Sequence, residues 1–160
     1  EHDIVAILDD DIAFSEELFD DLVGMVDEQT FVGAADWEFG LIAGRVMLFH
    51  RDIWRDVGGF DERLRSHNGD TDFSLKVHDA GYDLVRFPRE IVLHKEHSRS
   101  VTTRDRVWRL AYLCRKHPRY APHLLASTAT YNVARWTGIE YGLEIPPTVR
   151  DSALPERERW

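Results

Sequence analysis

The chain has 160 residues, a formal net charge of -9 and 43% hydrophobic residues, a size and composition that fit one globular domain. The negative charge argues against nonspecific binding to nucleic acid, which needs a basic surface. The single cysteine, Cys114, excludes a disulfide framework and a cysteine metal cluster, and no apolar run is long enough to span a bilayer. We therefore expect a cytoplasmic protein.

Two features of the whole chain are unusual. Three lysines accompany 17 arginines, and this acid-rich, lysine-poor composition fits either a salt-adapted protein or a high-GC genome. The chain also begins at Glu1 with residues that already resemble a core strand, and domains rarely begin in this way. We therefore expect the chain to be a fragment.

The first half of the chain alternates apolar runs with helix signals. Residues 4–8 are apolar and rich in branched side chains, which predicts a strand buried on both faces between parallel neighbours. Ser15 suits a helix N-cap, and apolar residues then recur at helical spacing to position 26. Two strands and a short helix follow, at residues 31–35, 45–49 and 51–57. Gly58 and Gly59 end that helix.

The second half continues the mixed α/β pattern. A helix is predicted at residues 70–80, where Gly81 ends it. Two strands and two helices follow, at residues 82–87, 90–94, 103–117 and 120–136. The tail from residue 146 is polar, and we expect it to be loose.

The stretch "ILDDDI" places three consecutive carboxylates after the first strand. If the backbone stays extended, Asp9 and Asp11 share one side and Asp10 faces the other. Two hard oxygen ligands on one side suit a divalent cation such as Mg²⁺ or Mn²⁺. An ordinary solvated loop explains the same residues, and both interpretations stay open.

Two further polar clusters are candidates for chemistry. In "HNGDTDF", Asp70 and Asp72 fall at the start of a helix, where they suit either helix capping or a general base. In "HKEHS", His94 and His97 follow a strand and are candidate metal ligands. In an extended segment they point to opposite sides, so we expect only one of them to bind a metal.

The order and spacing of these pieces resemble a known family. "ILDDDI", "GRVMLFHRDIWRDVGGFDERL", "NGDTDFSLKVHDAGYDLVRFP" and "EIVLHKEHSRS" together look like the C-terminal half of a family 2 glycosyltransferase of the GT-A fold. The resemblance covers about residues 3–100. It implies a partial GT-A fold, with a mixed sheet flanked by helices and without the N-terminal strands that bind the nucleotide. Three segments are expected: this half domain at 1–100, a helical extension at 101–145 and a tail at 146–160.

The resemblance also implies roles for individual residues. Asp9, Asp10 and Asp11 match the acidic motif that binds the donor diphosphate, with Asp9 and Asp11 as metal ligands. His94 matches a late metal-associated histidine, with His97 as the fallback, and Asp70 matches the catalytic base. Residues on the acceptor side are Gly44, Arg45, Asp61 and Asp72, of which Asp72 is expected chiefly to orient its neighbours.

The implied activity is an inverting, metal-dependent transfer. A sugar would move from a nucleotide-sugar donor to a hydroxyl of a glycan or a lipid-linked acceptor, in the synthesis of a cell-surface polysaccharide, glycolipid or glycoprotein. Position 69 is Gly where the family often has Glu, so a carboxylate beside the base is missing. A companion chain or a missing N-terminal half is expected to complete the donor pocket.

Other functions stay open. The chain could be a non-catalytic remnant or interaction module, or a metal-dependent hydrolase built from His67, Asp70, Asp72, His94 and His97. The basic helix at 104–117 could rest on the inner face of a membrane or pack on the domain in the ordinary way. Its basic residues are Arg104, Arg106, Arg109, Arg115 and Lys116.

Overall fold

The computed structural model describes residues 3–36, 38–64, 67–88, 92–94, 102–138 and 149–151. The chain divides into two compact units. The first contains residues 1–36, 41–96 and 145–160, and the second contains residues 37–40 and 97–144. Each unit is described by itself.

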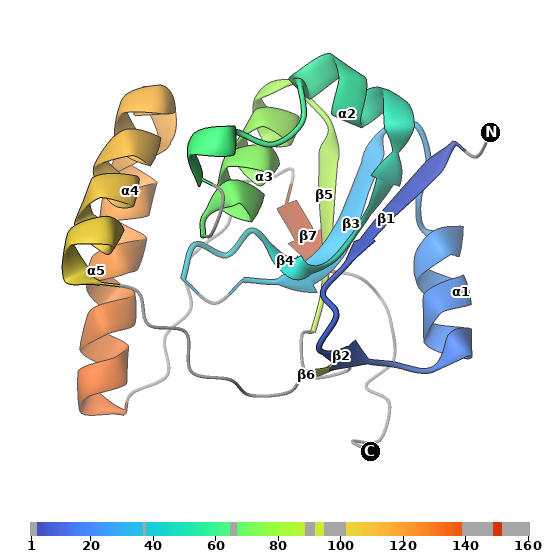
Figure 1. Ribbon diagram of the computed structural model, residues 1–160, viewed down its shortest axis with the longest axis horizontal. Helices are drawn as coiled ribbons and strands as arrows, with labels where there is room; N and C mark the ends of the chain where they lie inside the picture. The colour runs from blue at the N-terminus through green and yellow to red at the C-terminus, as the bar shows by residue number, and fades with distance from the viewer. Residues whose placement is uncertain are drawn as a thin grey trace. The chain divides into compact units, whose positions relative to one another are not determined.

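The first unit contains a mixed five-stranded sheet with the order β1-β4-β3-β5-β7 (Figure 1). β1 and β3 are antiparallel to β4, whereas β5 is parallel to β3 and β7 is parallel to β5. The strands are β1 (Ile4–Leu8), β3 (Thr30–Ala35), β4 (Ile42–His50), β5 (Asp83–Phe87) and β7 (Val149–Asp151). A separate ladder pairs β2 (Ile12–Ala13) with β6 (Leu93–His94). The predicted mixed α/β fold is confirmed.

Start and stop signals in the sequence define the helices of this unit. They are α1 (Glu16–Gly24), α2 (Arg51–Val57), the short 3₁₀ helix η1 (Glu62–Leu64) and α3 (Gly69–Asp79). The Ser15 hydroxyl accepts the Leu18 N–H at 3.2 Å and caps α1 as predicted. Gly58 ends α2 with a φ of 76°, a conformation that glycine adopts without strain.

The structure differs from two predictions about the sheet. β1 runs antiparallel, not parallel, to β4, its one neighbour among the described strands, and it exposes 42% of Leu8. None of the five residues of β1 is fully buried, so the apolar run predicted neither the cover of this strand nor its partner. Within the tail that is predicted to be loose, residues 149–151 form β7, in which Val149 pairs with Leu84, and the rest of the tail lies outside the described residues. Its charged residues suit an edge strand, because charge discourages further pairing.

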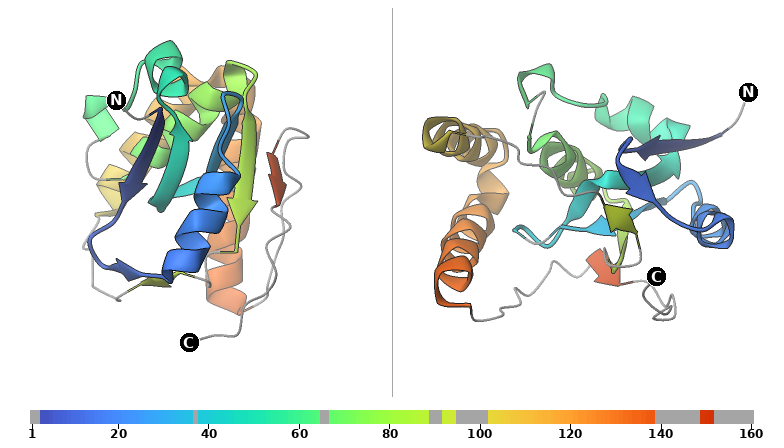
Figure 2. Two further views of the ribbon diagram at one scale, coloured as in Figure 1. Left: turned by 90° about the vertical axis from the view of Figure 1, so that its right-hand side faces the viewer. Right: turned by 60° about the horizontal axis from the view of Figure 1, so that its bottom comes forward.

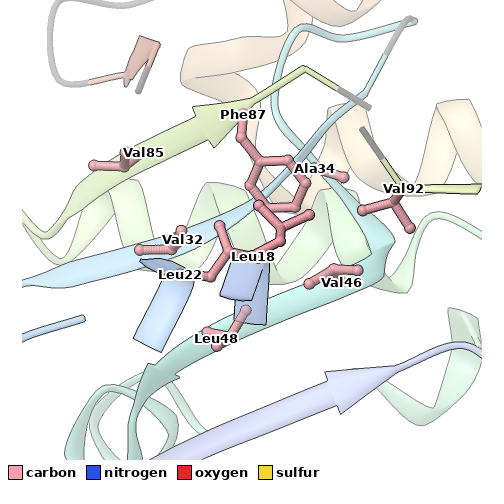
Figure 3. Close-up of a cluster of buried hydrophobic side chains, with 9 residues drawn as sticks. All are labelled: Leu18, Leu22, Val32, Ala34, Val46, Leu48, Val85, Phe87 and Val92. Carbon is pink, nitrogen blue, oxygen red and sulfur yellow. The ribbon is translucent and has the colours of Figure 1, made fainter. Parts of the chain in front are cut away.

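One face of the sheet packs against α1. Leu18 and Leu22 of this helix enter a cluster with alternate residues of three strands (Figure 3). The strand members are Val32, Ala34, Val46, Leu48, Val85 and Phe87, and Val92 completes the cluster. The period of two along each strand sends these side chains to one face. Figure 2 shows α1 on this face, with α2 and α3 on the other.

The other face carries an aromatic cluster that fixes α3 in place. Phe73 of α3 lies 5.3 Å from Phe31 of β3 and 5.2 Å from Phe49 of β4, measured between ring centroids. Phe60, from the "GGFDE" turn, lies 5.3 Å from Phe73 and 5.1 Å from Trp54 of α2. The turn, α2 and α3 are therefore joined by one set of rings, and edge-to-face pairs of this kind add to the stabilisation from burial.

Gly59 is the position in this turn where a side chain is least tolerable. Its φ is 64°, and an added Cβ would lie 2.6 Å from Trp54. We expect Gly59→Ala to lower the free energy of unfolding by about 2–4 kcal/mol, from backbone strain and overpacking together. Gly58→Ala is the matched control, because its φ is 76° but nothing lies within 4 Å of its added Cβ. It should lose only about 1 kcal/mol in chemical denaturation, and equal losses would contradict the packing argument.

The second unit contains two helices joined by a 3₁₀ turn. They are α4 (Thr103–Lys116), η3 (Pro118–Tyr120) and α5 (Ala121–Thr137). The His123 ring contacts the Phe39 carbonyl oxygen at 2.8 Å, and the Thr128 hydroxyl donates to Glu38 at 3.0 Å. These contacts hold residues 38–40 against α5. None of the helices that the structure describes has the length and apolar character to cross a membrane.

Candidate functional site

The topology gathers distant acidic residues at one edge of the sheet. β1 and β3 both run antiparallel to β4, so their carboxyl ends lie beside its amino end. Asp9 directly follows β1, Asp36 directly follows β3, and Gly44 and Arg45 lie near the start of β4. In open α/β sheets, ligands bind beyond the carboxyl ends of strands. This edge is therefore the candidate site.

Asp70 is held at this edge by two main-chain hydrogen bonds. Its Oδ2 accepts the Gly44 N–H at 2.7 Å, and its Oδ1 accepts the Thr71 N–H at 2.9 Å. The main chain of Gly44 lies close to this carboxylate, and a Cβ added to Gly44 would be 3.4 Å from Asp70 Oδ2. The first turn of α3 thus places a half-buried carboxylate over β4, in a position that depends on backbone donors rather than mobile side chains.

The environment of Asp70 makes it a better base. Burial, and after it the nearby charge of Asp36, outweigh the lowering effect of the Gly44 and Thr71 N–H donors and raise its pKa from 3.8 to about 6. A carboxyl group with a pKa of about 6 is ionised at neutral pH yet accepts a proton more readily than an ordinary aspartate. No sequence motif contains Asp36. The one signal that could have identified it is its position directly after the strand at residues 31–35.

The acidic run after β1 does not stay extended. The Asp9 N–H donates to the Arg45 carbonyl oxygen at 3.0 Å, which continues the β1–β4 ladder by one residue. The chain then turns at Asp10 and Asp11 before β2. The backbone is therefore not extended across all three aspartates. The expectation that Asp9 and Asp11 share one side of a strand and Asp10 faces the other is wrong. Asp10 is exposed, whereas Asp9 and Asp11 are half-buried.

Two consecutive residues of β4 form hydrogen bonds with the two acidic motifs. Arg45 accepts the hydrogen bond from Asp9, and Gly44 donates the one to Asp70. Near the same run, β6 pairs with β2 so that His94 lies opposite Ile12, the residue after Asp11. The His94 side chain and all of His97 lie outside the described residues. Among the side chains that are described, no three carboxylate, histidine or cysteine groups gather as a metal cluster.

Two other predicted acceptor residues have structural contacts. Asp72 is fully buried, with its Oδ2 3.5 Å from the Lys76 ammonium, which also donates to the Gly59 carbonyl oxygen. Asp72 therefore offers no surface to an acceptor, and its contact with Lys76 lies within α3. The Asp61 carboxylate accepts the Arg63 N–H at 3.0 Å and caps η1. His67 is half-buried in the turn before α3.

Comparison with known protein families agrees with the resemblance to a family 2 glycosyltransferase. The sequence profile of glycosyl transferase family group 2 matches residues 31–121, more than half of the chain. The chain belongs to this family. No curated protein and no solved structure matches the chain. The resemblance predicted from the motif order is confirmed.

Membership places the chain among the glycosyltransferases, whose substrates are a nucleotide-sugar donor and an acceptor. The matched range includes Gly44, Arg45, Asp70 and His94, whereas the acidic run at 9–11 precedes it. The mixed sheet with flanking helices is consistent with part of a GT-A-like domain. The roles of individual residues stay predictions.

Proposed function

We propose that this family 2 glycosyltransferase is an inverting, metal-dependent enzyme in which Asp70 is the general base. The observation that supports the proposal is the position of the Asp70 carboxylate. Two backbone N–H groups hold it at the sheet edge that also carries Asp9. A base fixed by the main chain meets a requirement of general-base catalysis, which depends first on geometry and then on pKa.

In the proposed reaction, the acceptor hydroxyl attacks the anomeric carbon of the donor sugar. Asp70 takes the hydroxyl proton as the new glycosidic bond forms, and the bond from the sugar to the nucleotide diphosphate breaks. Attack from the face opposite the departing diphosphate inverts the anomeric centre. The raised pKa of Asp70, about 6, favours this proton transfer without leaving the group protonated at pH 7.

The acidic run suits a divalent cation. Asp9 and Asp11 would hold Mg²⁺ or Mn²⁺ together with His94, and Asp10 would complete the diphosphate-binding run, with His97 as the alternative ligand. Mg²⁺ is commonly held by one or two carboxylates and by phosphate oxygens, so a small protein ligand set fits a nucleotide diphosphate. When bound, the cation supplies charge stabilisation for the departing diphosphate.

The acceptor side would be formed by residues next to the base. Gly44 brings the main chain against Asp70, and Arg45 is half-buried beside it. Asp61 lies in the turn whose Phe60 packs on α3. We infer that a glycan or lipid-linked acceptor presents its hydroxyl between these residues and Asp70, as in the synthesis of a cell-surface glycan.

The proposal is tested by donor binding and turnover in the complete gene product. With Mn²⁺ and a panel of nucleotide sugars, we expect calorimetric donor binding that EDTA abolishes. We also expect acceptor-dependent release of a nucleoside diphosphate. Asp9→Asn combined with Asp11→Asn should weaken donor binding at least tenfold, whereas Asp20→Asn combined with Asp21→Asn on α1 should not. Phosphoester hydrolysis without sugar transfer would support the hydrolase instead, and binding without turnover would support a non-catalytic module.

A further inference from the structure

The helical segment differs in charge from the rest of the protein. Residues 102–138 contain seven Arg or Lys residues and one acidic residue, Asp105, although the whole chain has 20 basic and 29 acidic residues. A segment with a net charge of +6 therefore belongs to a chain with a net charge of -9. Such a segregated positive charge attracts an anionic surface, whether a membrane or the acidic remainder of another copy.

α4 combines this charge with exposed apolar groups on one face. Arg104, Trp108, Ala111 and Arg115 follow one another at steps of four, three and four residues, so they line one face over about 16 Å. All four are exposed, and Trp108 exposes 49% of its surface. Val107 beside them exposes 63%, whereas Leu113, on the other side of the helix, is fully buried. We call the face formed by Arg104, Val107, Trp108, Ala111 and Arg115 the basic face of α4.

The Trp108 indole is also held in place along the helix. Its ring stacks on Tyr112, with the centroids 5.4 Å apart and the planes 11° from parallel. An indole fixed between arginines is the arrangement that favours a lipid–water interface, where the ring sits at the headgroup level and the guanidinium groups contact phosphates. An ordinary solvent-exposed helix needs no such apolar centre between its charges.

α5 provides a comparison, because its exposed face lacks this charge pattern. Leu125, Val133 and Trp136 are exposed at helical spacing, and Trp136 exposes 88% of its surface. Arg135 is its one basic residue, and its guanidinium group lies 5.8 Å from the Tyr131 ring. Exposed tryptophan is therefore present on both helices, whereas the flanking arginines are present only on α4.

We propose that the basic face of α4 docks on an anionic lipid surface, with Arg104 and Arg115 on the phosphates and Trp108 at the interface. The occupant is a bilayer rather than another protein because exposed apolar side chains, Val107 and Trp108, lie between the two arginines on one helix face. This pattern is typical of a basic amphipathic helix at an anionic lipid surface. The helix lies on the surface and does not cross it, in agreement with its length and hydropathy. This inference does not depend on the proposed catalysis.

Vesicle co-sedimentation of the 160-residue chain tests the proposal. We expect binding to phosphatidylcholine vesicles that contain about a third phosphatidylglycerol, no binding to pure phosphatidylcholine, and a decrease with added salt as the charges are screened. Near an anionic membrane each arginine contributes about fivefold to binding. Arg104→Gln combined with Arg115→Gln should therefore weaken binding about 30-fold, and Trp108→Ser should weaken it about tenfold.

Matched variants make the test specific. Arg55→Gln combined with Arg63→Gln removes the same charge from exposed sites in the first unit and should leave binding unchanged. Trp136→Ser removes an even more exposed indole from α5 and should also leave it unchanged. Equal loss in both double arginine variants, or loss in Trp136→Ser but not in Trp108→Ser, would overturn the proposal. Equal binding to neutral vesicles would do the same, as would a dimer in light scattering that Trp108→Ser dissociates.

Discussion

Replacing Asp70 with asparagine is expected to abolish sugar transfer while leaving the protein folded and able to bind its donor. The amide cannot take the acceptor proton, and general-base catalysis typically contributes about 10²–10⁴-fold to the rate. Asparagine has the same shape, and its oxygen can still accept the N–H of Gly44 or Thr71. Turnover should therefore fall by at least about 100-fold with little change in the donor Kd. Unchanged turnover would remove Asp70 from the mechanism.

The same substitution has a second readout that needs no substrate. Because the pKa of Asp70 rises from 3.8 to about 6 on folding, the folded state binds the proton more tightly. Its contribution to stability is complete below pH 3.8 and is lost as the pH rises through 6. The free energy of unfolding of the wild type, relative to Asp70→Asn, should fall by about 2 kcal/mol between pH 4 and pH 7. Denaturation at the two pH values measures this difference.

Asp36 provides the control for this pH dependence. Its charge is the second cause of the raised pKa of Asp70, after burial. Asp36→Asn should therefore lower the pKa of Asp70 without returning it to 3.8, a shift that carboxyl-carbon NMR can follow directly. Asp20→Asn, at an exposed site on α1, should leave that titration unchanged. A pKa of Asp70 that does not respond to Asp36→Asn would contradict the assignment of this neighbour.

Lys76→Met is expected to be among the most destabilising substitutions in the first unit. Asp72 is fully buried, and the Lys76 ammonium lies 3.5 Å from its carboxylate as an oppositely charged partner. Removing one partner of a buried ion pair leaves the other charge in an apolar environment. We expect the free energy of unfolding to fall by about 3 kcal/mol. The Gly59 carbonyl oxygen would also lose its donor, so the "GGFDE" turn should loosen from α3.

Two further variants isolate the cause of this effect. Asp72→Asn combined with Lys76→Met removes both charges and should recover part of the loss, because a neutral amide is less costly to bury. Arg55→Met breaks the pair with Asp52, which is also within one helix but exposed on both sides, and should lose less than about 1 kcal/mol. A double variant that is no more stable than Lys76→Met would show that Lys76 acts through packing alone.

The elements that could be predicted from the sequence are those with local signals. Ser15 and Gly58 mark helix ends through contacts within a few residues, and both predictions are confirmed. The neighbours of a strand are not a local property. The apolar run at 4–8 predicted a strand correctly but not its antiparallel pairing with β4 at the edge, and the polar tail gave no sign that Val149 pairs with Leu84.

The same distinction applies to the site. Asp70 and Asp9 were identified as candidates because their motifs occur in a recognisable order, whereas the contact that links them runs through Gly44 and Arg45, far away in the sequence. Asp36 was missed because a single carboxylate after a strand carries no motif. The turn at Asp10 was missed because a triple aspartate is compatible with either an extended or a turned backbone.

The hydrogen bonds that β4 makes to Asp9 and Asp70 have a consequence for how acceptor preference can change. Both bonds use the main chain of β4, at the Arg45 carbonyl oxygen and the Gly44 N–H, and neither uses a side chain of the strand. The spacing between the base and the acidic run is thus independent of the residue at position 45. Under the proposed assignment of Arg45 to the acceptor side, substitutions there should alter which acceptor is recognised and preserve the spacing between Asp70 and the acidic run.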